Sequence, residues 1–224
     1  MLYGASAMKS VIWFDSSLSD AHGEMAGIIG YRAFYNASSL TTLTLTSPLT
    51  DIRHQAFGVC SSLRCIDVKG TVSPSLKIEP NAFNGVPGGC IIRCARAEDV
   101  ALVNQILANN NITNVKATDM SVEPTPAPKV TKLPFISWTE VDPAALGATA
   151  YGSMKGTYSN NWWAYFQDTK TLKFFAKKAS GYNEVGILGH CEDGAGWSAY
   201  KEEIEHVVIG PSIHKLTAMC FTGM

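Results

Sequence analysis

The side chains best suited to covalent chemistry stand together once, in the run His190-Cys191-Glu192-Asp193. A thiol beside an imidazole is the starting point for a cysteine nucleophile. Adjacent residues of an extended chain point to opposite faces, however, so His190 is poorly placed to activate Cys191. Glycines flank the run on both sides and are typical of a loop. We therefore interpret the run as a solvated turn, with a cysteine nucleophile as the alternative.

Two cysteine pairs, Cys60/Cys65 and Cys90/Cys94, resemble metal ligands at first sight. Their spacings are looser than the Cys-x-x-Cys of zinc sites, and no histidine pair completes a ligand set. We expect these thiols to be structural, and a disulfide among them stays open if the protein is exported. Neither Gly-x-Ser-x-Gly nor His-Glu-x-x-His occurs. The sequence thus predicts no catalytic residue, no metal and no cofactor, and favours a non-enzymatic protein.

The elements that would position any functional residue are repeats. Two segments agree in one register, at an offset of 23 residues (56 − 33). Such self-similarity at a fixed period is the signature of stacked repeat units. The matched positions are Ala33/Ala56, Phe34/Phe57, Ser39/Ser62, Leu40/Leu63, Leu43/Ile66 and Leu45/Val68.

The register continues beyond these two copies. Downstream, Ala82 and Phe83 repeat the Ala-Phe unit at an offset of 26 (82 − 56). Upstream, Trp13 takes the Leu45 position at an offset of 32 (45 − 13), and the insertion is predicted as a loop between residues 16 and 26. Near the end of the chain, Ile209 takes that same position at an offset of 164 (209 − 45). The sequence therefore predicts a repeat that begins again near residue 206.

Each unit carries more apolar side chains than one coil can cover, so neighbouring coils must stack. The pattern Ile29-Gly30-x-x-Ala33-Phe34, followed by Leu40-x-x-Leu43-x-Leu45, resembles the BspA-like class of leucine-rich repeats. In that family Ile-Gly-x-x-Ala-Phe-x-x-Cys-x-x-Leu-x-x-Ile-x-Leu-Pro is the recurring unit, and Cys60 stands at the Cys position. Residues 160–224 are similar to the segment that introduces a new repeat array in such proteins.

A helix and a linker complete the expected architecture. Apolar residues at helical spacing predict a helix over 97–109, which would cap the last coil. A short strand is expected after it, over 112–116. Three prolines within residues 124–128 indicate a semi-rigid linker. We expect a β-rich fold with some α: a leucine-rich-repeat solenoid with its helical cap over 1–120, a Pro-rich linker over 121–133, and a second small β-rich unit over 134–224 that ends in a partial repeat.

Composition narrows the function. The formal net charge is −1 and charged residues make up 17% of the 224, which gives no electrostatic reason to expect nucleic acid or an anionic membrane. No apolar run reaches the length of a membrane span. A repeat scaffold without chemistry favours a binding module for protein or glycan. The exposed strand positions predicted to bind are Thr42, Thr44, Arg64, Asp67 and Arg93.

The family resemblance implies a cell-surface or secreted protein that adheres to host or neighbouring-cell proteins. The alternative is a structural protein whose repeat units stack with sister subunits, because an open repeat end exposes apolar surface. The pattern starts inside one repeat and stops inside another, and no export signal is visible. We therefore expect this chain to be a segment of a longer protein, or else one whose open coil is buried by a partner or by its own second unit.

Overall fold

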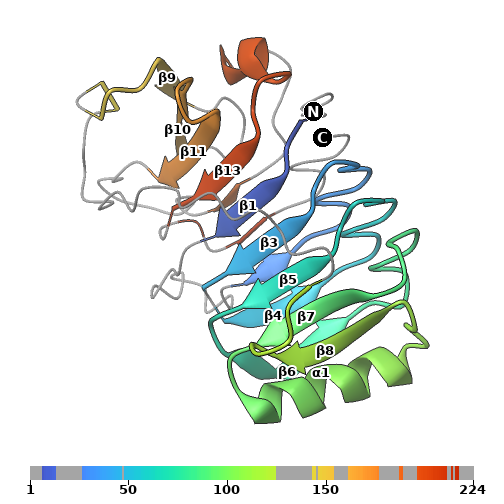
Figure 1. Cartoon of the computed structure of the whole chain (residues 1–224). Helices are drawn as coiled ribbons and strands as arrows, with labels where there is room; N and C mark the ends of the chain where they lie inside the picture. Colours follow the sequence, from blue (N-terminus) through green and yellow to red (C-terminus); the bar gives the residue numbers. More distant parts are fainter. Residues whose placement is uncertain are drawn as a thin grey trace.

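The described residues form two β-sheets and one α-helix, so the chain is β-rich with some helix, as predicted (Figure 1). We call the nine-stranded sheet the front sheet and the five-stranded sheet the back sheet. The cysteine-histidine run at 190–193 lies outside the described residues. The structure, a computed structural model, describes residues 7–13, 27–46, 48–124, 143–144, 146–153, 161–176, 187–188, 196–210, 213 and 215–216.

From β1 to β8 in one sheet and from β2 to β6 in the other, neighbouring strands come from successive repeats. In spatial order the front sheet holds β8 (Val115–Asp119), β7 (Cys90–Cys94), β5 (Cys65–Val68), β3 (Thr42–Leu45), β1 (Ser10–Trp13), β13 (His206–Ile209), β11 (Thr171–Ala176), β10 (Asn161–Phe166) and β9 (Ala150–Ser153). The back sheet holds β12 (Ile187–Leu188), β14 (Lys215–Leu216), β2 (Ile28–Ile29), β4 (Leu49–Ile52) and β6 (Val72–Ile78).

The pairing of the front sheet reproduces the register read from the sequence. Leu45 lies beside Val68, as the 23-residue offset predicts, and Val68 lies beside Cys94. The upstream match is confirmed as well, because Trp13 pairs with Leu45. These four side chains point between the sheets and are almost fully buried. Each coil thus covers the apolar row of the next, which is the reason the repeat exists.

A ladder of phenylalanines fills the bend between the two sheets. Phe34 and Phe57 stack with ring centroids 5.3 Å apart and an interplanar angle of 3°, and Phe57 stacks on Phe83 at the same distance. The backbone follows the side chains, since the Phe34 amide donates to the Ala56 carbonyl at 2.8 Å. The repeated Ala-Phe unit therefore places a small residue at the turn and an aromatic ring between coils.

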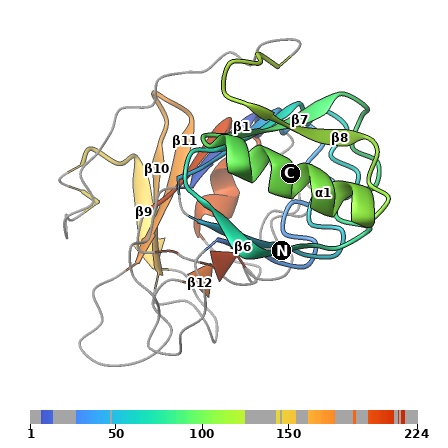
Figure 2. The same cartoon turned by 90° about the horizontal axis from the view of Figure 1, so that it is seen from below.

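The helix α1 (Ala97–Asn109) forms over the predicted residues and lies across the end of the stack, between β6 and β8 (Figure 2). Asn111 takes a left-handed conformation with φ 55°. Its amide donates to the Ala108 carbonyl at 3.0 Å, and the Ile112 amide donates to the Leu107 carbonyl at 2.9 Å. This pair of hydrogen bonds is a Schellman motif, which explains why the following strand starts at residue 115, after the predicted 112.

Side chains of α1 occupy hydrogen-bonding groups at the edges of both sheets. The buried Asp99 carboxylate accepts from the Val72 amide of β6 at 3.3 Å and is held by the Arg96 guanidinium. The Asn104 amide donates to the Ala117 carbonyl at 3.0 Å and accepts from the Ala117 amide at 2.8 Å, on edge strand β8. The helix thereby supplies the hydrogen bonds that a further strand would make.

Strands from both sides of the predicted linker share both sheets. In the front sheet β13 lies parallel to β1 (Figure 1). In the back sheet β14 lies parallel to β2. The last repeat of the chain therefore stacks on the first one. The boundaries at 121 and 133 stay a prediction, but the residues beyond them continue the same stack.

Candidate functional site

The candidate site is the outer face of the front sheet, where every second side chain points away from the core. The sheet register aligns a row of such residues across six strands. Three of the five residues predicted from the sequence belong to this row. In spatial order the row reads Lys173, Val208, Ile12, Thr44, Asp67 and Arg93.

The other two predicted residues occupy different positions. Thr42 lies in the parallel row two residues earlier on β3 and, like Thr44, is half-buried. Arg64 precedes β5, and its guanidinium turns back to donate to the carbonyls of Ser61 at 3.4 Å and Leu63 at 3.1 Å. Thr42 and Thr44 are therefore placed together, while Arg64 belongs to the turn beside them.

Asp67 and Arg93 bind each other. The Arg93 guanidinium donates to both carboxylate oxygens of Asp67, at 2.7 and 2.8 Å, and the side chains of Arg93 and Asp67 are only 13% and 17% exposed. Burial by itself would raise the pKa of Asp67, but hydrogen bonds from Arg93 and Cys65 lower it below the ordinary value. The same pairing raises the pKa of Arg93. Both groups are thus charged and paired across the β5–β7 boundary.

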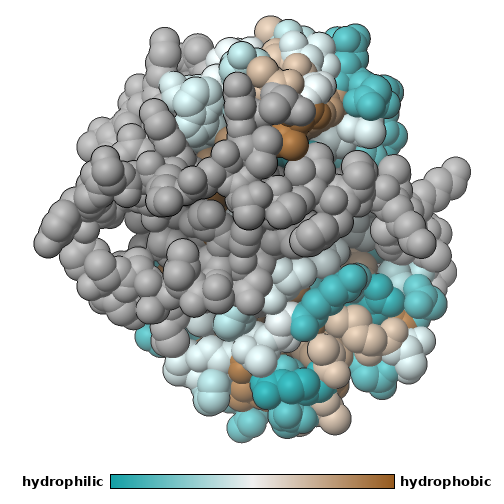
Figure 3. Space-filling view, turned by 90° about the vertical axis from the view of Figure 1, so that its left-hand side faces the viewer, coloured by the Kyte–Doolittle hydropathy of each residue, from teal (hydrophilic) through white to brown (hydrophobic). Residues whose placement is uncertain are grey.

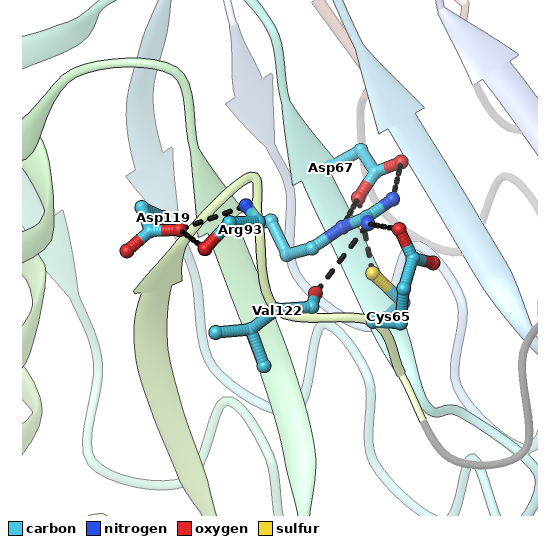
Figure 4. A network of polar contacts seen from close by, with 7 residues as sticks. Cys65, Asp67, Arg93, Asp119 and Val122 are labelled. Carbon is cyan, nitrogen blue, oxygen red and sulfur yellow. Dashed lines mark hydrogen bonds and ion pairs between the residues drawn. The ribbon is translucent and has the colours of Figure 1, made fainter.

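The segment after β8 folds back over this ion pair. The Arg93 guanidinium also reaches the Glu123 carboxylate at 3.3 Å and the Val122 carbonyl at 3.5 Å (Figure 4). Asp119 orients the turn by accepting from the Ser121 amide at 2.7 Å. Arg93 therefore anchors residues 122–123 to the sheet, and its charge is engaged within the chain.

The thiols of this region have the properties of structural cysteines. Cys60, Cys65, Cys90 and Cys94 are all buried and free. Burial raises the pKa of Cys60 and of Cys90 to about 12, so neither forms a thiolate near neutral pH. Among the described residues no group of three or more His, Cys, Asp or Glu side chains could hold a metal ion.

On the other side the register carries the row through a buried amine that the sequence did not single out, and on to Ala164 of β10 and Tyr151 of β9. Lys173 is almost fully buried, and its Nζ lies 4.4 Å from the centroid of the Phe166 ring. Burial lowers the pKa of Lys173 to about 8. The cation–π contact partly compensates for the lost hydration. Between Lys173 and the Arg93–Asp67 pair, Ile12 of β1 and Thr44 of β3 are half-exposed.

A hydroxyl–imidazole contact joins β1 and β13 on this face. The Ser10 Oγ and His206 Nδ1 atoms are 2.8 Å apart. Burial lowers the pKa of His206, and the lysines at 9 and 170 act in the same direction. The sequence alignment at an offset of 164 gives β13 its place in the repeat register, but it does not specify β1 as its neighbour.

A second polar surface runs along the turns that carry the phenylalanine ladder. The rings of Tyr31 and His54 stack 5.8 Å apart. The Arg32 guanidinium lies 5.0 Å from the Tyr31 ring and 4.8 Å from the Tyr35 ring, and its Nε donates to Gln55 at 2.6 Å. The same 23-residue offset aligns Tyr31 with His54, so this stack could have been predicted from the sequence. Elsewhere on the surface, the described residues in Figure 3 mix hydrophilic and hydrophobic groups in small patches.

Comparison with known proteins identifies the repeats. Residues 24–119 match the family model of the BspA type leucine rich repeat region, in six copies. This match over part of the chain confirms the resemblance drawn from its sequence. The family is one of repeat proteins with protein-binding or surface roles. No curated protein and no solved structure matches the chain. Among the described residues there is no helix with the length and hydropathy of a membrane span.

Proposed function

We propose that this protein is a non-enzymatic binding module that adheres to a protein or glycan partner through the outer face of its front sheet. The supporting observation is the half-buried polar stretch over β1 and β3, formed by Ser10, Thr42 and Thr44 together with Ile12. Short hydroxyl side chains on paired strands are held rigidly, so a partner binds them with little loss of conformational entropy. The stretch is neutral, which suits a protein or glycan better than a polyanion.

The same proposal includes the architecture and the location. The stacked coils form a leucine-rich-repeat solenoid, α1 is its cap, and residues 121–133 link the two units. The protein acts outside the cell or at the cell surface, which agrees with the family it resembles. Arg93 and Asp67 contribute by fixing the rim of the binding face, because each already neutralises the other.

A binding screen on the whole chain tests this function. The chain is applied to arrays of glycans and extracellular-matrix proteins, and each partner found is measured again with Thr44→Arg, which places a long charged side chain in the middle of the face. We expect Thr44→Arg to weaken binding at least tenfold. The matched control is Ser75→Arg, at an exposed position of β6 in the back sheet. No partner on either array, or equal losses for the two variants, would refute the proposal.

Assembly with sister subunits is the second candidate. The observation that favours it is the stacking of β13 on β1, because the last repeat of this chain is complementary to the first. A contact between two different surfaces of the same chain is of the kind that also joins separate copies.

A further inference from the structure

The joint between β13–β14 and β1–β2, which we call the closure seam, brings together residues that are 196 positions apart in the sequence. Four residue pairs align β13 with β1, and two align β14 with β2. The Trp13 indole Nε1 donates to the Ile213 carbonyl at 2.5 Å in the buried core. Glu205 accepts from Lys9 and from Lys170, each at 2.8 Å. The seam is thus a specific, partly buried interface between distant parts of the chain.

The backbone pattern across the seam is the same as between sequence-adjacent repeats. The Lys9 amide donates to the Glu205 carbonyl at 2.8 Å. In the next joint the Thr41 amide donates to the Lys9 carbonyl at 2.9 Å, and in the one after it the Arg64 amide donates to the Thr41 carbonyl at 3.0 Å. The front sheet therefore does not distinguish a neighbouring repeat that follows in the sequence from one that arrives separately.

We propose that the closure seam also forms between two copies of this chain, which exchange the segment from β9 to β14. Each copy then stacks its β13 on the partner's β1, and the contacts of the seam are made twice. Every group that this interaction needs is present in the chain itself. In dilute solution the closed monomer predominates, because the tethered segment has an effective concentration in the millimolar range, far above the concentration of other copies. At higher local concentration, as on a crowded surface, exchange links the binding faces of two copies.

Removing the tether provides the decisive test. Glu123 forms an ion pair with Arg93 of β7, which itself binds Asp67 of β5. Even when counted from β5, β9 lies six strand spacings away, which amounts to about 29 Å. Deleting residues 125–147 leaves a reach of only about 10 Å between Pro124 and β9. The deletion variant therefore cannot close its own seam. We expect light scattering to give twice the mass of the chain, and a folded, monomeric deletion variant would overturn the proposal.

A circular permutant is the matched control. It begins at residue 148, joins Met224 to Met1 through a flexible Gly/Ser linker, and ends at Pro124, so it lacks the same residues as the deletion variant. Its two halves are connected across the seam, and we expect a folded monomer with cooperative thermal unfolding. A dimeric permutant would show that loss of residues 125–147, and not the lost tether, causes association, which would also overturn the proposal.

Charge reversal tests the full-length chain and decides the matter if the deletion variant does not fold. Within one chain, Lys9→Glu and Glu205→Lys each place like charges at residues 9 and 205, which repel across the seam. In an exchanged dimer of one chain of each variant, residue 9 of either chain faces an opposite charge at residue 205 of the other. After concentration and slow dilution of an equal mixture, we expect mixed dimers at least fivefold above either homodimer by native mass spectrometry. Combining both substitutions in one chain should restore the monomer. A mixture that holds monomers alone would refute the proposal. Ligand binding enters neither readout, so the proposed function can fail independently.

Discussion

Val59 occupies a backbone conformation that valine rarely adopts. Its φ is 61°, and the equivalent residues of the neighbouring repeats are Asn36 at 57° and Gly85 at 78°. Asparagine and glycine tolerate the left-handed region, whereas a β-branched side chain is strained there. The Val59 side chain is 44% exposed, so it recovers little of this cost through packing. The repeat thus imposes the left-handed backbone conformation at this turn, and valine adopts it in spite of the strain.

Replacing Val59 by asparagine should therefore stabilise the protein. We expect Val59→Asn to raise the free energy of unfolding by about 1 kcal/mol, because left-handed strain costs 1–2 kcal/mol per residue. Urea denaturation followed by circular dichroism measures the change. The control is Val122→Asn, at a residue that is 39% exposed and has no left-handed φ. A gain of the same size in Val122→Asn would attribute the effect to surface polarity and contradict the strain argument.

The five predicted binding residues show how far single positions can be read. Alternation along each strand placed Thr42, Thr44, Asp67 and Arg93 on the outer face. The 26-residue offset also aligned Asp67 with Arg93, so their ion pair could have been inferred. The return of residues 122–123 over that pair could not, because a proline-rich segment carries no periodic pattern that fixes its direction.

Among the elements, α1 has a position that its own sequence predicts and a role that only the structure reveals. Its apolar spacing and the asparagines after it defined a helix over 97–109. The strand that follows was expected over 112–116, but Ile112 serves the helix end and is buried there. The hydrogen bonds that Asp99 and Asn104 form with the sheet edges depend on the distance between helix and strand, which no local pattern specifies.

Asn104 should matter for the edge that it covers. Asn104→Ala removes both hydrogen bonds to Ala117, and we expect the free energy of unfolding to fall by about 1 kcal/mol. Because the freed backbone groups lie on an edge strand, self-association at high concentration should also increase. Urea denaturation and light scattering measure the two effects. Gln105→Ala, at an exposed neighbouring position of α1, should change neither, and an equal loss in that variant would contradict the edge role.

At the scale of the whole molecule, the order of repeats in space differs from their order in the sequence. The register of each repeat was readable, including the return of the pattern near residue 206. That the last repeat would cover the first one was left as one of several outcomes, since any repeat of this type fits on any other. The specific contacts Trp13–Ile213 and Lys9–Glu205 close the stack, and they join residues about which periodicity says nothing.

The closure seam should weaken in acid. Hydrogen bonds from Lys170 and Lys9 lower the pKa of Glu205 to about 2, below the value of about 4.3 for an unperturbed glutamate. The ionised carboxylate therefore stabilises the fold fully above that ordinary value, and this stability is lost as the pH falls from about 5 to about 2. The lowered pKa of His206 acts in the same sense, because protonation in acid favours the unfolded chain.

Glu205→Gln isolates this contribution. We expect it to lower the free energy of unfolding at pH 7 by about 1 kcal/mol, discounted for the partial exposure of the pair, and to flatten the decline between pH 5 and 3. Urea denaturation across this pH range, with hydrogen exchange of the β1 amides, is the measurement. Glu79→Gln, at an exposed residue, is the control. An unchanged slope in Glu205→Gln would disprove the role of this carboxylate.

The seam also decides how the molecule carries a mechanical load. A pull between residue 9, at the start of β1, and residue 216, at the end of β14, passes first through the hydrogen bonds and the indole contact that join these two repeats. The repeats from β3 to β8 lie beside that path and keep the helix at their end. Tension would therefore separate β13 from β1 before it disturbs the repeats from β3 to β8, and the stretched protein would present the bare edge of β1 while those repeats stay folded.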